Sequence, residues 1–118
     1  MSGGNQLSMY GSDEYILTYN AELGPPWRTL ERWLQVYYPF FHADRIKTPT
    51  LFLGGDKDFN VPVRGGEQMY AALRTLGVPT QLIVYPGQFH LLTRPSYIRD
   101  CVQRYLAWFD RNLAPAAP

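Results

Sequence analysis

Three ionisable residues that could do acid–base chemistry follow two apolar runs of the sequence. Asp56 and Asp58 lie in "GGDKDFNVPV", directly after "TPTLFL", and His90 ends "YPGQFH", directly after "TQLIV". An aspartate that accepts a hydrogen bond from a histidine ring holds the tautomer needed for proton transfer. The pair of Asp58 and His90 therefore suits general-base chemistry if the fold brings the two side chains together.

Two expected strands and the helix between them would position this pair. Apolar runs over about 50–54 and 80–85, bounded by proline and glycine, predict strands that are buried on both faces, with Gly54 and Gly55 turning the chain off the first. Apolar residues at helical spacing predict a helix over about 65–76, with Leu76 pointing inward. Such a strand–helix–strand unit is parallel, and both loops follow carboxyl ends of its strands.

Further helices are expected on either side of this unit. Helical spacing predicts one helix over about 27–38 and another over 95–113, and Gly24 closes a shorter one before them. The apolar stripe that should dock the last helix on the sheet contains Ile98, Cys101, Val102, Tyr105, Leu106, Phe109 and Leu113. The predicted fold class is α/β, a single domain over 1–118 with a short parallel sheet of two or three strands flanked by helices.

Simpler roles for the same residues stay open at this level. Aspartate and asparagine after a strand commonly form turns or helix N-caps, and a histidine in a loop is more often structural than catalytic. His42, in the connection before the first expected strand, fits a structural or partly exposed role. The joint placement of Asp58 and His90 on neighbouring strand ends is what favours the functional interpretation.

A calcium loop is the competing interpretation of the acidic cluster. The first, third, fifth and twelfth positions of such a loop match Asp56, Asp58, Asn60 and Glu67. The sixth position requires a glycine with positive φ, and a β-branched residue, Val61, occupies it. We therefore expect neither a metal nor a cofactor.

Composition excludes several other classes. The 118 residues, 46% of them hydrophobic, suffice for one domain core, and the net charge of +1 does not favour nucleic-acid binding. Every apolar run is shorter than the roughly 18 to 20 residues that a membrane-spanning helix needs. The first residues lack a secretory signal, which favours the cytoplasm. One cysteine, Cys101, excludes an internal disulfide and a cysteine-built zinc site.

A long central stretch closely resembles the last part of the catalytic domain in the prolyl oligopeptidase family of serine peptidases. The family pattern is an aspartate followed by two residues and Val-Pro, then Glu-Gln-Met-Tyr, then Tyr-Pro-Gly leading to a histidine. Here these motifs are Asp58 before "FNVP", "EQMY" over 67–70 and "YPGQFH" ending at His90, and the resemblance runs from about Leu7 to Leu113. It implies the C-terminal portion of an α/β-hydrolase fold, with peptide substrates. Asp58 would be the triad acid and His90 the general base, while Asp56 would lie outside the triad.

The nucleophile of that triad is not in this sequence. Ser2, Ser8, Ser12 and Ser96 all lack the paired glycines of a GxSxG elbow. The resemblance implies that the elbow, the oxyanion donors and the earlier strands lie upstream of Met1, so we expect a peptidase fragment that is inactive alone. Its open sheet edge favours a homo-oligomer or pairing with the missing N-terminal part. A noncatalytic self-associating or peptide-binding module and one half of a split hydrolase are the alternatives.

Overall fold

The computed structural model of this chain describes residues 10–11, 16–37 and 39–113. Several positions used in the sequence analysis lie outside the described residues. They are Met1, Ser2, Leu7, Ser8, Ser12 and Tyr38.

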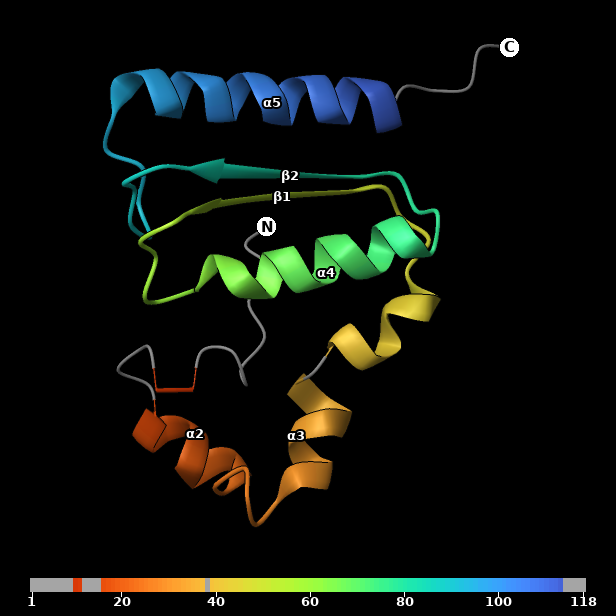
Figure 1. Cartoon of the computed structure of the whole chain (residues 1–118), viewed down its shortest axis with the longest axis vertical. Coiled ribbons are helices and arrows are strands. Elements are labelled where there is room, and N and C mark those ends of the chain that lie inside the picture. Colours follow the sequence, from red (N-terminus) through yellow and green to blue (C-terminus); the bar gives the residue numbers. More distant parts are fainter. Residues whose placement is uncertain (1–9, 12–15, 38, 114–118) are drawn as a thin grey trace.

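A parallel two-stranded sheet forms the centre of the fold. β1 (Thr50–Gly55) pairs in parallel with β2 (Thr80–Tyr85), from Thr50 opposite Thr80 to Gly55 opposite Tyr85. The connecting helix α4 (Val63–Thr75) covers one face of this sheet, and α5 (Pro95–Leu113) covers the other (Figure 1). The short parallel sheet flanked by helices is confirmed.

Two small cores lie on opposite faces of β1, because successive side chains of a strand point to opposite sides. Toward α4, Phe52 packs with Met69 and Leu73. Toward α5, Leu51 and Leu53 form the second core together with Tyr85. All three central side chains of β1 are buried, as expected for a strand covered on both faces.

The second strand is less covered than its apolar sequence predicts. Tyr85 is its one buried residue, and Val84 is 37% exposed, so the expectation that β2 is buried on both faces was wrong. Within the described residues β2 has a single strand neighbour, β1. Its other edge therefore has no strand partner among these residues.

The first helices differ from the predicted range. α2 (Ile16–Leu23) is followed by Gly24, whose φ is +77°, as expected for a glycine that closes a helix. α3 covers Leu30–Tyr37 and does not begin at Trp27, because the N–H groups of Arg28 and Thr29 both donate to the carbonyl of Pro25 in a turn. Trp27 is consequently 73% exposed, whereas Trp33 is almost fully buried.

Two further expectations about the middle of the chain need comment. The 3₁₀ segment η1 (Pro39–Arg45) contains His42, which is half-buried, as a structural or partly exposed role requires. α4 begins at Val63 and ends at Thr75. Leu76 therefore follows the helix and is half exposed, so the expectation that it points inward was wrong.

The apolar stripe of α5 extends beyond the sheet that it covers. Cys101, Tyr105 and Trp108 pack against the core on β1, but most of the predicted stripe faces solvent. The exposed members are Ile98, Val102, Leu106, Phe109 and Leu113. The expectation that they dock on the sheet was wrong, because two strands are too narrow to cover a stripe of this width.

A hydrogen-bonded phenol between β2 and α5 makes stability depend on alkaline pH. Tyr85 Oη donates to Asp100 Oδ2 (3.0 Å), and burial, supported by that bond, raises the pKa of Tyr85 above its ordinary value of 10.0. The unfolded phenol ionises first, so the contribution of Tyr85 to the free energy of unfolding should be constant below about pH 10 and fall as pH rises further. Urea unfolding between about pH 8 and about pH 11 should show that fall, and Tyr85→Phe should reduce it. An equal fall in both proteins would contradict the assignment.

Candidate active site

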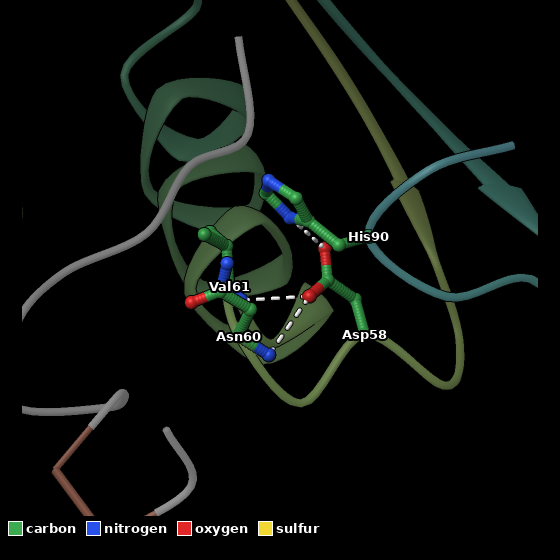
Figure 2. Close-up of polar contacts among 4 residues, drawn as sticks. All are labelled: Asp58, Asn60, Val61 and His90. Carbon is green, nitrogen blue, oxygen red and sulfur yellow. Dashed lines mark hydrogen bonds and ion pairs between the residues drawn. The ribbon is translucent and has the colours of Figure 1, made fainter. Parts of the chain in front are cut away.

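The carboxylate of Asp58 is held by its own loop. Asp58 lies three residues after β1, and its side chain is only 4% exposed. Its Oδ1 accepts the backbone N–H groups of Asn60 (3.0 Å) and Val61 (2.7 Å), as Figure 2 shows. Because the carboxylate accepts these bonds with Oδ1, its second oxygen, Oδ2, is fixed in direction.

The fixed oxygen meets the ring of His90. Asp58 Oδ2 lies 3.0 Å from His90 Nδ1, and the other ring nitrogen points away from the carboxylate (Figure 2). A carboxylate only accepts hydrogen bonds, so in the neutral ring Nδ1 carries the proton and Nε2 keeps its lone pair. The histidine side chain is 48% exposed. The structure thus brings together the two residues that the sequence singled out and leaves Nε2 able to take a proton.

Besides the contact between Asp58 and His90, three further contacts join the loop of the aspartate to the loop of the histidine. Asp56 Oδ1 accepts the N–H of Gly87 (2.7 Å), and the Lys57 N–H donates to the carbonyl of Gln88 (2.9 Å). The exposed rings of Phe59 and Phe89 contact each other with centroids 6.4 Å apart. Asp56 therefore lies outside the Asp58–His90 pair and ties its two supporting loops together.

A tight turn after β2 sets the start of the histidine loop. In Tyr85–Gln88 the last N–H donates to the Tyr85 carbonyl (3.3 Å), and Gly87 has a φ of +69°, as in a type II turn with proline second. This turn lies directly on Gly55, where a Cβ atom would overlap the carbonyl oxygen of Gln88. Gly55 was expected to turn the chain off the strand; it instead ends β1 and is needed for this close approach.

A cavity of about 250 Å³ lies beside the pair. It extends from Asp58 and His90 to side chains of α5, and its wall includes Leu53, Tyr85, Leu92, Cys101 and Tyr105. The wall is partly apolar and partly polar, and Asp58 and His90 supply its carboxylate and its imidazole. Space for another segment or for a substrate group is therefore available next to His90.

The three carboxylates of the calcium pattern engage separate partners. Asp56 holds the Gly87 N–H, Asp58 faces His90, and Glu67 lies 3.0 Å from the guanidinium of Arg64. Across the described part of the chain, no three His, Cys, Asp or Glu side chains form a group that could hold a metal ion. The geometry of this loop is that of a carboxylate paired with a histidine.

One buried polar residue of the site carries no signal in the sequence pattern. Gln88 is 3% exposed, and its side chain reaches from the turn after β2 to the residues just before α5. A glutamine in a loop is ordinarily solvated. Only the folded chain reveals that this one is enclosed.

Comparison with known proteins identifies the family. A profile described as "Prolyl oligopeptidase family" matches residues 4–116. The chain belongs to the prolyl oligopeptidase family. This confirms the resemblance carried by the motifs around Asp58 and His90, and the match lies in the C-terminal part of the family's catalytic domain.

Individual family members support the same assignment. The acylamino-acid-releasing enzyme of Arabidopsis thaliana is 38% identical over 73 residues, which is 62% of this chain and 10% of that protein. The enzyme of that name from Homo sapiens is 29% identical over 116 residues, 92% of this chain and 16% of that protein. The chain therefore spans only a small part of the length of these family members.

The fold also matches a solved structure. A puromycin-hydrolyzing peptidase of Mycobacterium tuberculosis superposes with a TM-score of 0.78 at 24% identity, over 95% of this chain and 17% of that chain. At this identity the likeness shows the fold, which is the C-terminal portion of an α/β-hydrolase.

Among the residues that the structure describes, no helix is both long and apolar enough to cross a membrane.

Proposed function

We propose that this chain supplies the acid and the general base of a serine peptidase triad, with Asp58 and His90 in these roles. The observation that carries the proposal is the 3.0 Å contact between a nearly buried carboxylate oxygen and Nδ1 of a half-exposed imidazole. This arrangement leaves Nε2 free to act on a nucleophile. Membership of the prolyl oligopeptidase family supports peptides as the substrates.

In the reaction, His90 Nε2 takes the proton of a serine hydroxyl as its oxygen attacks the peptide carbonyl carbon. Asp58 stabilises the imidazolium that forms by accepting its Nδ1–H, and the histidine then gives the proton to the leaving amine. The printed sequence has no GxSxG elbow, so the serine comes from polypeptide outside these 118 residues. Alone, the chain has negligible triad activity, because loss of a nucleophile typically costs several orders of magnitude in rate.

A chimera tests these roles. Residues 46–113 replace the corresponding segment of the Arabidopsis acylamino-acid-releasing enzyme, and labelling by a fluorophosphonate probe and release of nitroaniline from an acetylamino-acid nitroanilide are measured. The chimera should be labelled and active, and the 118-residue chain alone should be neither. His90→Ala in the chimera should lose both signals while its thermal melt is preserved. A folded His90→Ala chimera that reacts as fast as its parent would overturn the proposal.

We also infer that the exposed stripe on α5 pairs with the remainder of the catalytic domain. Its members recur at helical spacing, and Leu106 and Leu113 are 60% and 72% exposed. A contiguous apolar surface of this kind usually marks an interface.

In isolation the chain should therefore form homo-oligomers through this face, and light scattering should give a mass that rises with concentration. Leu106→Lys should shift the chain toward monomer, while a matched polar-side change, Arg99→Lys, should not. A monomeric wild-type chain at all concentrations would contradict this.

A further inference from the structure

Gln88 uses all of its polar groups inside the site. Its side-chain Oε1 accepts the backbone N–H of Thr93 (2.9 Å) and that of Arg94 (3.4 Å), and its Nε2 donates to the carbonyl of Gly87 (3.3 Å). Its own N–H and carbonyl are engaged by Tyr85 and Lys57. A side chain this buried would cost stability if these groups were left unpaired.

These bonds close a short loop around the histidine. The side chain of Gln88 reaches the backbone of Thr93 and Arg94, so this side chain and residues 88–93 form a closed ring. His90 is one of the residues of that ring. One end of the ring is fixed to the aspartate loop, since the Gln88 carbonyl accepts the Lys57 N–H. The other end is fixed to the beginning of α5. The backbone that carries His90 is therefore held from both sides by one residue.

We propose that Gln88 is a positioning residue for the general base: its amide oxygen fixes the loop that points His90 Nδ1 at Asp58. This inference rests on the proposed function of His90. The essential feature is an oxygen acceptor at the end of a side chain of this length, because the bonds that close the loop all run to Oε1, including one from the Thr93 hydroxyl (3.4 Å). The side-chain donor makes a single longer bond to the neighbouring residue.

The chemistry of the side chain suggests a matched pair of variants. Gln88→Glu keeps an oxygen acceptor at the same reach for Thr93 and Arg94, and gives up only the donor that Nε2 directs at the Gly87 carbonyl. Gln88→Met has a similar length and fills the buried space, but it offers no comparable acceptor. Only the second variant should release the loop.

NMR of the full 118-residue chain tests the role directly. The low-field Nδ1–H resonance of His90 should be present in the wild type and in Gln88→Glu, and absent or strongly broadened in Gln88→Met. The amides of Thr93 and Arg94 should exchange with solvent about tenfold faster in Gln88→Met. Leu73→Ala, which weakens the core on the other face of β1, should leave the resonance intact wherever the chain is folded. Should Gln88→Met fail to fold, Gln88→Asn, one methylene too short to reach, takes its place.

Kinetics of the chimera give an independent readout. Gln88→Met should lower kcat about tenfold with little change in KM, because it alters the loop geometry and not a contact with the substrate. Gln88→Glu should keep most of the kcat of the parent chimera. An unchanged resonance with unchanged kcat in Gln88→Met, or equal losses in both variants, would overturn the role of Gln88. Activity of the His90→Ala chimera would instead refute the proposed function. The NMR experiment would then still show whether Gln88 holds the loop of His90.

Discussion

Replacing Asp58 by asparagine in the chimera is expected to lower kcat by a factor on the order of 10⁴, with the fold retained. Asparagine keeps an oxygen for the N–H groups of Asn60 and Val61, so the loop is preserved. Its amide nitrogen, however, faces His90 Nδ1 and can only donate. The imidazole must then carry its proton on Nε2, where it has to accept one from the serine. Steady-state kinetics with the nitroanilide substrate measure the loss.

Asp56→Asn is the matched control for this substitution. The same change of charge occurs two residues away, and the remaining oxygen can still accept the Gly87 N–H. Its kcat should stay within about twofold of the parent, as for most substitutions away from a reacting group. Similar losses for Asp56→Asn and Asp58→Asn would mean that loop charge, and not the tautomer of His90, controls the rate.

Adding one methyl group at Gly55 is expected to displace the loop that carries His90. In Gly55→Ala the new Cβ overlaps the Gln88 carbonyl oxygen and comes within 2.6 Å of the carbonyl oxygen of Phe89, so backbone has to move. Overpacking of this kind costs about 1–3 kcal/mol in the free energy of unfolding. A shift of the histidine loop by about 1 Å can lower kcat by about 100-fold. Urea unfolding of the chain and kinetics of the chimera measure the two effects.

The neighbouring glycine offers a control in the same strand. A Cβ at Gly54 would lie 3.5 Å from a methyl group of Val63, which is ordinary van der Waals contact. Gly54→Ala should therefore keep both stability and kcat close to those of the parent. If Gly55→Ala behaves in the same way, the contact between the end of β1 and the turn at Gln88 is not tight in solution.

Local signals were sufficient to predict the elements next to the site. β1 and β2 are apolar runs bounded by proline and glycine, and the helix between them has clear periodicity, so the parallel pairing followed from chain connectivity. The start of α3 was not predictable from spacing alone, because the turn at Pro25 competes with the helix for Arg28 and Thr29. α5 docks on the sheet as predicted, but the extent to which its stripe is covered was mispredicted, because periodicity reports an apolar face and does not say what covers it.

Some residues of the candidate site could likewise be predicted from the sequence, and others could not. The proximity of Asp58 and His90 could be predicted, since both follow carboxyl ends of adjacent parallel strands. Gln88 and Gly55 could not, because their importance arises from contact between two loops that are distant in sequence. Neither a buried glutamine in a loop nor a close backbone approach leaves a periodic pattern that a sequence can display.

Asp58 accepts two backbone N–H groups, and this structural role does not depend on hydrolysis. In a lineage that abandons catalysis, selection for folding alone would favour the aspartate, because an apolar replacement removes the acceptor of both N–H groups. His90, half exposed, would be under no comparable constraint. A descendant with the aspartate and without the histidine is therefore the form that such a pseudoenzyme should take.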